Sequence, residues 1–270
     1  MAEPAVLTLA TRGRLAHLHN QAAALRAYAP AARHVVVTMG PEFDPGCGDL
    51  HAHLPAADGR LPLAAARNLA ADLAMANGHR ELVLLDVDCL PTPGLLPAYR
   101  RALAARPRAL LCGPVSYLPA ETAGADWQQL VTHRAPHPAR PDPPAGTLAD
   151  GGDHDLFWSL SFACTAETWR ELGGFCTEYA GYGGEDTDFG RLARVAGIDL
   201  VWVGGADAVH QWHPTSSPPW QHLDDILVNA RIFHRRWGDW PMRGWLEAFE
   251  QAGALRRTGS GWEKTQSPTR

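Results

Sequence analysis

The chain has 270 residues, is 46% hydrophobic and 20% charged, and carries a formal net charge of −5 at pH 7. This length can bury a full core in one large domain or two small ones. The acidic balance is not typical of nucleic-acid-binding proteins, so we expect no nucleic-acid partner. The five cysteines are an odd number without a CxxC pair, so we expect no disulfide framework.

The beginning of the sequence shows no targeting signal. Residues 1–15 lack a charged stretch followed by an apolar one. No apolar run approaches the roughly 18 residues that span a bilayer. We therefore expect a cytoplasmic protein without a transmembrane segment.

The first half of the chain alternates predicted strands and helices. Short apolar runs predict buried strands, and Ala- and Leu-rich stretches with apolar residues at helical spacing predict helices. The expected strands cover residues 5–13, 34–40, 81–88 and 109–118, and the expected helices cover 15–28, 63–77 and 94–105. This alternation is typical of a parallel sheet in an α/β fold, where ligands bind at the carboxyl ends of the strands.

The second half begins with residues 119–155, which are rich in Pro, Gly and Asp and show no period. This composition predicts a long loop or flap. Beyond it we expect strands at 157–165 and 199–205 and helices at 166–175, 185–196 and 220–236. The polar tail, 255–270, is expected to be disordered.

Two acids follow a buried strand in the stretch VLLDVDCLP, where Asp86 and Asp88 are separated by one residue. In an extended segment alternate side chains point to the same face, so the two carboxylates would lie together. Two close like charges are costly unless a cation lies near them. A divalent cation held by oxygen ligands would meet this need, and a solvated pair of acids in a turn is the simpler alternative.

Two histidines, His210 and His213, lie three residues apart in VHQWHP. They can offer two imidazoles to one metal ion. With the aspartates they would form a mixed nitrogen and oxygen set, which suits Mn²⁺ better than a pure oxygen set. Either one alone is better explained as one of thirteen ordinary histidines.

The stretch GYGGEDTD, residues 181–188, places glycines before three acids. Glycines allow a tight turn and close approach to a ligand, and the dipole of a helix stabilises ionised acids at its amino end. Such a carboxylate can accept a proton from a hydroxyl nucleophile. Helix capping alone explains one of the acids, but hardly three.

Arg67 and Asn68 interrupt an apolar helix. The arginine could reach a phosphate, and the asparagine could bond a base or sugar. An exposed face of an amphipathic helix is an equally good explanation of this pair.

Together these segments resemble a family-2-type glycosyltransferase with the GT-A fold, over residues 5 to 240. The matching segments, in order, are TLATRGR, PLAAARNLAA, LVLLDVDCLP, LGGFCTEYAGYGGEDTDFGRLARVAG and VHQWHP. The GYGGEDTDF block is the most specific, since it resembles the WGGEDDD segment of β1,4-galactosyltransferases and related galactosyltransferase C-terminal domains. Tyr182 stands where those proteins have Trp.

The resemblance implies an α/β, GT-A fold with a Rossmann-like, mostly parallel sheet flanked by helices. It implies a single domain over 1–254, with a nucleotide-binding half at about 1–115 and an acceptor-binding half at about 116–254. In the family pattern Asp186 would be the general base and Glu185 would bind the acceptor.

The resemblance also implies a donor site and a metal site. Asp88, His210 and His213 would ligate Mn²⁺ (or Mg²⁺) directly. Asp86 would bind the ribose, or the metal through water. The residues near the nucleotide-sugar would be Thr11, Arg12, Arg67, Asn68, Asp86, Val87 and Gly184.

The implied reaction is metal-dependent, inverting transfer of a hexose from a nucleotide-sugar, with a UDP-sugar favoured, to an acceptor hydroxyl. The acceptor stays open among glycans, glycosides, small molecules and proteins. Two alternatives are a sugar-phosphate nucleotidylyltransferase and a non-catalytic nucleotide-sugar-binding protein. The first leaves the GGED block unexplained, and the intact Asp186 argues against the second.

Overall fold

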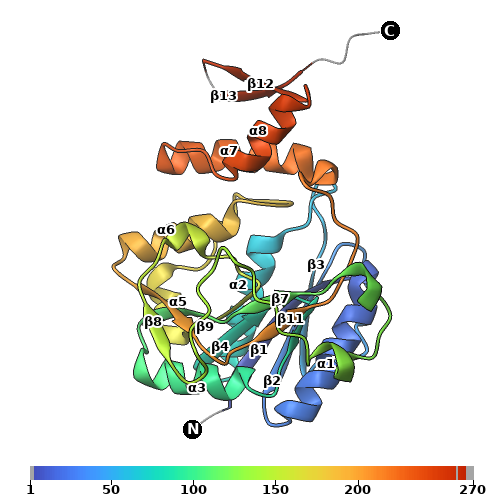
Figure 1. The fold of residues 1–270 in the computed structure, drawn as a ribbon, viewed down its shortest axis with the longest axis vertical. Helices are drawn as coiled ribbons and strands as arrows, with labels where there is room; N and C mark the ends of the chain where they lie inside the picture. The colour runs from blue at the N-terminus through green and yellow to red at the C-terminus, as the bar shows by residue number, and fades with distance from the viewer. Residues whose placement is uncertain (1–2, 260, 266–270) are drawn as a thin grey trace.

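The computed structural model describes residues 3–259 and 261–265 and is built around a central eight-stranded sheet (Figure 1). The strand order is β3-β2-β1-β4-β9-β6-β10-β8. The first four strands are parallel, β9 is antiparallel to both its neighbours, and β8 is an antiparallel edge. The bounds are β1 Ala5–Thr11, β2 Arg33–Met39, β3 Leu50–Leu54, β4 Glu81–Leu85, β6 Ala109–Cys112, β8 Leu148–Asp150, β9 Ser161–Thr165 and β10 Asp199–Val203.

Helices cover both faces of this sheet, because alternate strand residues point to opposite sides. Leu7 and Leu84 pack with α2 (Leu63–Ala76), α5 (Ala166–Leu172) and α6 (Glu185–Val195). Val6 and Val83 pack with α1 (Leu15–Tyr28) and α3 (Leu95–Ala105) on the other face. The predicted α/β fold, a mostly parallel sheet flanked by helices, is confirmed.

A second, three-stranded sheet carries part of the site. Its order is β5 (Cys89–Pro91), β11 (Ala208–His210) and β7 (Val115–Tyr117). The single strand expected at 109–118 is wrong, because the chain breaks at Gly113 into β6 and β7. A Cβ at Gly113 would stand 2.0 Å from the carbonyl oxygen of Ala206. The residue must therefore be glycine for the chain to cross there.

The long segment 119–155 is less irregular than expected. It contains the one-turn helix α4 (Trp127–Leu130) and the edge strand β8. Four short 3₁₀ turns complete the connections: η1 Arg12–Arg14, η2 Ala120–Thr122, η3 His154–Leu156 and η4 Trp220–His222.

The C-terminal elements form a layer of their own above the start of α6 (Figure 1). They are α7 (Leu223–Trp237), α8 (Arg243–Gln251) and the hairpin β12 (Leu255–Thr258) and β13 (Gly261–Lys264). The expectation of a disordered tail is wrong over 255–259 and 261–265, because Leu255 and Trp262 are buried against α7 and α8. The rest of that expected tail, 266–270, lies outside the described residues.

Two further expectations concern single features. All five cysteines are free thiols, as expected. Within residues 3–259 and 261–265, no helix has the length and apolar character needed to cross a bilayer.

Candidate active site

One aspartate and two histidines meet at the carboxyl end of β4. Asp88 lies 3.4 Å from His210, measured from Oδ1 to Nε2, and 3.3 Å from His213, from Oδ2 to Nε2. One ligand atom from each of the three lies within 4.8 Å of the others. These residues form a candidate metal site, the same three that the sequence singles out as direct ligands.

Strand pairing explains why residues so far apart in sequence meet. β11 pairs antiparallel with β5, so His210 stands opposite Cys89, the neighbour of Asp88. The sequence suggested that the two aspartates lie on an extended segment, and this expectation is wrong. β4 ends at Leu85 and the chain turns, with the Cys89 N–H donating to the carbonyl of Asp86 at 2.8 Å. The turn directs Asp88 toward the histidines and frees Asp86 for another partner.

The pKa of Asp88 reflects these neighbours. Burial pushes this pKa up, but a hydrogen bond from His213 and the nearby charges of His210 and His213 outweigh burial and lower it to about 2. The pKa of His210 is lowered by burial. An ionised Asp88 beside a His210 imidazole whose neutral form is favoured matches the protonation state that a divalent metal requires of such ligands.

Asp86 is paired with a cation from α2. The Arg67 Nη2 lies 3.6 Å from Asp86 Oδ1, and Nη1 donates to Glu185 Oε1 at 3.0 Å. Arg67 and Glu185 are nearly fully buried. The guanidinium of Arg67 is thus engaged by two carboxylates, and its expected contact with a phosphate stays a prediction. Burial raises the pKa of Asp86 to about 7, against the opposing charge of Arg67.

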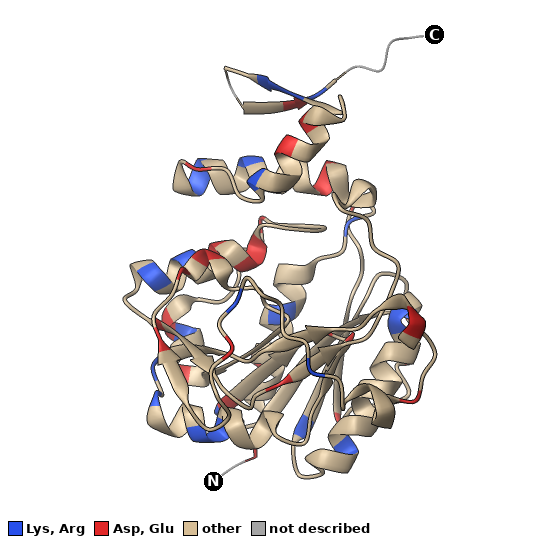
Figure 2. Ribbon diagram, in the orientation of Figure 1, with Lys and Arg blue, Asp and Glu red and all other residues tan. Residues whose placement is uncertain are grey.

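The acid block forms the first turn of α6, as Figure 2 shows in red. Gly184 precedes the helix with φ of +92°, a backbone conformation that favours glycine. Glu185 Oε2 is buried and has no hydrogen-bond partner among the described residues. Burial, assisted by the charge of Glu185, raises the pKa of Asp186 to about 6. A carboxylate with such a pKa can act as a base near neutral pH.

The third acid of the block has a structural role that the sequence did not reveal. Asp188 is fully buried, and its Oδ1 accepts hydrogen bonds from Arg236 Nε and Trp237 Nε1, both at 2.7 Å. Tyr179 donates its hydroxyl to the same oxygen at 3.2 Å. Asp188 therefore fastens α7 to α6.

Four other residues were predicted to lie near the donor: Thr11, Arg12, Val87 and Asn68. Thr11 ends β1, and the neighbouring Arg12 is exposed, with Nη2 bonded to the carbonyl of Glu42 at 3.0 Å. Both lie at the same edge of the sheet as Asp86. The side chain of Val87 packs into an apolar cluster, and the expected place of this residue beside the nucleotide-sugar stays a prediction.

Asn68, the fourth of these residues, bonds the backbone of Phe175. Its side chain donates to the carbonyl of Phe175 at 2.9 Å and accepts from the Phe175 N–H at 2.8 Å. Both ends of the amide are thus used to hold the backbone ahead of the acid block. Asn68 therefore has a structural role, and its predicted contact with a base or sugar stays a prediction.

Sequence reasoning missed the residues that hold the turn with the two aspartates. Gln21 is fully buried in α1 and donates to the carbonyls of Asp86 and Cys89, at 2.8 and 2.9 Å. The Gln211 N–H donates to the carbonyl of Asp88 at 2.7 Å. The one feature of the sequence that could have indicated this role is a polar side chain, Gln21, next to the apolar run of a predicted helix.

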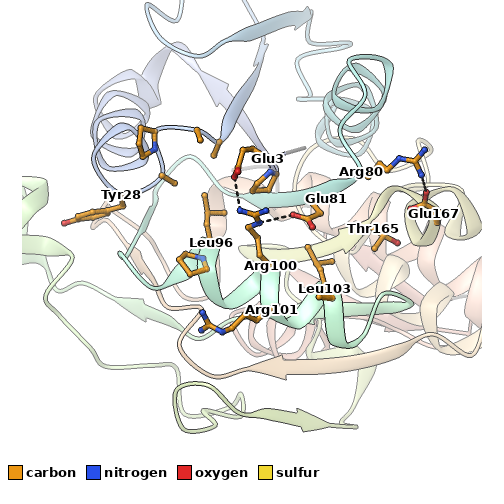
Figure 3. A pocket seen from close by; sticks show the side chains of 17 residues that line it. Glu3, Tyr28, Arg80, Glu81, Leu96, Arg100, Arg101, Leu103, Thr165 and Glu167 are labelled. Carbon is orange, nitrogen blue, oxygen red and sulfur yellow. Dashed lines mark hydrogen bonds and ion pairs between the residues drawn. The ribbon is translucent and has the colours of Figure 1, made fainter. Parts of the chain in front are cut away.

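A pocket of about 650 Å³ lies elsewhere, at the amino ends of the central strands (Figure 3). Five of its six charged side chains pair with one another, Arg100 with Glu3 and Glu81, and Arg80 with Glu167. The pocket contains none of the residues discussed above. The chemistry is therefore concentrated at the opposite edge of the sheet.

Comparison with known proteins supports the resemblance seen in the sequence. The family model described as the N-terminal domain of galactosyltransferase matches residues 154–211, which include the acid block and His210. No curated protein matches the chain.

Three solved structures are similar in fold. The catalytic domain of Drosophila β1,4-galactosyltransferase 7, in complex with xylobiose, is 17% identical with a TM-score of 0.50, and the match covers 79% of this chain and 72% of that chain. GalNAc-T7 with UDP, GalNAc and Mn²⁺ is 14% identical with a TM-score of 0.58, covering 88% of this chain and 48% of that chain. TarS 1–349 of S. aureus is 11% identical with a TM-score of 0.58, covering 86% of this chain and 64% of that chain. The chain spans about half the length of the GalNAc-T7 chain. The likenesses confirm the GT-A fold.

Proposed function

We propose that this chain, which has the GT-A fold of glycosyltransferases, is a metal-dependent, inverting glycosyltransferase that moves a hexose from a nucleotide-sugar to an acceptor hydroxyl. The observation that carries the proposal is that two groups of residues lie together at one edge of the sheet. A cluster of Asp88, His210 and His213 lies there, and Arg67 joins the neighbouring Asp86 to the acid block.

The donor set fits a divalent metal such as Mn²⁺ or Mg²⁺. One carboxylate and two imidazoles stand within 4.8 Å of one another, and such a mixed set suits Mn²⁺. When bound, the metal would neutralise charge on the leaving nucleoside diphosphate. GalNAc-T7 was crystallised with UDP, GalNAc and Mn²⁺, and this supports a UDP-sugar as the favoured donor.

The protein residues divide the remaining work. Asp186 takes the proton of the acceptor hydroxyl while the acceptor oxygen bonds to the anomeric carbon. The bond from that carbon to the diphosphate oxygen breaks, and its electron pair leaves with the nucleoside diphosphate. A single displacement of this kind inverts the anomeric configuration and needs no covalent enzyme intermediate.

Glu185 is the proposed acceptor ligand. Its Oε1 is held by Arg67, which leaves the buried Oε2 without a partner among the described residues. A buried acceptor atom without a hydrogen bond is costly, and a substrate hydroxyl would satisfy it. The galactosyltransferase 7 structure contains xylobiose, which supports a carbohydrate acceptor.

The test is release of nucleoside diphosphate from UDP-, GDP- and dTDP-sugars, with and without Mn²⁺, over a panel of glycoside acceptors. We expect metal-dependent release and a product whose anomeric configuration, read by NMR, is opposite to that of the donor. Binding of a sugar nucleotide without release for any acceptor would indicate a non-catalytic binding protein. Release of pyrophosphate from a nucleoside triphosphate and a sugar phosphate would indicate a nucleotidylyltransferase.

A further inference from the structure

Aromatic side chains from the C-terminal layer gather beside the acid block. The ring of Tyr182 stacks on His222, with centroids 4.5 Å apart and planes 15° apart, and lies 5.9 Å from the ring of Trp245 on α8. Tyr182 is 38% exposed. Because Tyr182 belongs to the glycine turn before α6, this stack borders the proposed base Asp186.

Trp220 extends the aromatic surface away from the base. It is 46% exposed, and its ring packs edge-on against Phe249 with centroids 4.9 Å apart. Phe249 follows Trp245 by four positions, so it lies about 6 Å further along the α8 axis. The exposed rings of Tyr182 and Trp220 therefore contact α8 at points one helical turn apart. We call Tyr182, His222, Trp245 and Trp220 the α8 aromatic surface.

Polar groups flank these rings. Asp225 accepts the N–H of Tyr182 at 3.3 Å and pairs with Arg60 at 3.2 Å. Aromatic faces next to charged and hydrogen-bonding groups suit a ligand with an apolar face and a polar rim. A pyranose ring has this character, with C–H groups on its faces and hydroxyls around its edge.

We propose that the α8 aromatic surface binds two successive sugar rings, with Trp220 forming a second sugar subsite, so that the acceptor is an oligosaccharide of at least two rings. The reacting ring lies against Tyr182 and His222, and the next ring lies on Trp220. The proposal rests on the proposed function, because Asp186 defines which end of the acceptor reacts. His222, Trp245 and Trp220 lie outside residues 154–211, so the family match includes only Tyr182 of this surface.

The experiment measures binding of matched mono- and disaccharides to the whole chain with Mn²⁺ and UDP present. Isothermal titration calorimetry would compare xylose with xylobiose, glucose with cellobiose, and N-acetylglucosamine with chitobiose. At least one disaccharide should bind about tenfold more tightly than its monosaccharide, the size expected of one aromatic contact. Trp220→Ala should remove this difference and leave monosaccharide binding unchanged.

Two further variants complete the design. Trp127→Ala removes a tryptophan that packs on Tyr28 elsewhere in the fold, and it should keep the full difference. Trp220→Leu retains an apolar contact to Phe249 but lacks the ring, so it tests the subsite if Trp220→Ala does not fold. A disaccharide preference that survives in Trp220→Leu, or no preference in the unmodified chain, would overturn the subsite.

The outcomes separate the subsite from the proposed function. Trp220-dependent disaccharide binding without any nucleoside diphosphate release would support the subsite and reject the transferase. Transfer to acceptors with one sugar ring, with no gain from a second ring, would support the transferase and reject the subsite.

Discussion

Arg67 donates a hydrogen bond to Glu185 at 3.0 Å, although 118 positions separate the two residues in the sequence. The other side of the same guanidinium lies 3.6 Å from Asp86. One buried cation from α2 thus joins the turn beside the candidate metal site to the first turn of α6. The proposed donor and acceptor sides of the site are held in a fixed relation through this single side chain.

Replacing Arg67 should therefore destabilise the fold as well as the site. Arg67→Met leaves the buried Glu185 and the partly exposed Asp86 without their cation, and removing one partner of a buried ion pair costs about 3–5 kcal/mol. Urea unfolding followed by circular dichroism measures this change. The control is Arg80→Met, which breaks the exposed pair with Glu167 and should have little effect. Equal losses in the two variants would contradict the structural role of Arg67.

Asp186→Asn should abolish transfer and leave donor binding intact. Loss of a general base lowers the rate by roughly 10²–10⁴-fold. The affinity for UDP and Mn²⁺, measured by calorimetry, should not change, because Asp186 is not part of the metal cluster. Transfer at an undiminished rate would show that another group takes the proton.

The pH dependence of the rate should report the same residue. The pKa of Asp186 is raised to about 6, chiefly by burial, and only the ionised carboxylate can accept a proton. At saturating donor, metal and acceptor, kcat should fall as the pH decreases through about 6 and be constant above it. Asp86 has a pKa raised to about 7, so the profile is also measured in Asp86→Asn. If kcat of that variant still falls near pH 6, the fall is due to Asp186. If the fall disappears, it is due to Asp86.

Metal binding should separate the two aspartates of the turn. Asp88→Ala and His213→Ala each remove a proposed ligand, and they should weaken Mn²⁺ binding by more than about 100-fold, since even outer-shell changes cost 10–100-fold. Asp86→Asn should bind Mn²⁺ nearly as well as the unmodified chain in the absence of nucleotide, because Asp86 pairs with Arg67. Paramagnetic resonance of free Mn²⁺ measures all three. If Asp86→Asn were the only variant to bind Mn²⁺ weakly, Asp86 and not Asp88 would be the metal ligand.

Asp188→Asn should behave differently from Asp186→Asn despite the shared motif. Asp188 bonds Arg236, Trp237 and Tyr179 in the interior, so loss of its charge should lower the free energy of unfolding by about 3 kcal/mol. Thermal unfolding measures this loss. At a temperature where the variant is folded, its kcat should remain within a few fold of the unmodified value. A catalytic defect without a stability defect would contradict the structural assignment.

The sequence predicted the first half of the fold well, because its strands are continuous apolar runs and its helices are strongly periodic. It placed a strand across Gly113, because the carbonyl of Ala206 that forces the break comes from a distant segment. It missed α8 and the final hairpin, where few apolar residues are buried and the pattern is short. Leu255 and Trp262 are visible as buried only once α7 and α8 are in place.

The three residues of the candidate metal site were predicted through the resemblance to the family pattern, because the spacing of the aspartates or of the histidines alone has simpler explanations. The partners of Arg67 were not, because a guanidinium pairs equally well with a phosphate or a carboxylate. The roles of Asn68 and Gln21 depend on which backbone groups lie within reach, and these are set by tertiary packing. For the same reason the structural role of Asp188, two positions after Asp186, could not be predicted from the sequence.

The pairing of β11 with β5 has a consequence for how this protein tolerates changes in length. The ladder fixes His210 opposite Cys89, and a slip by one residue would turn the histidine to the other face of the strand. An insertion between Ala208 and His210 should therefore abolish the site even if every ligand is retained. Insertions in the exposed parts of 119–155 should leave the site intact. The chain between β7 and β11 contains this segment, and both of its ends are held in the three-stranded sheet.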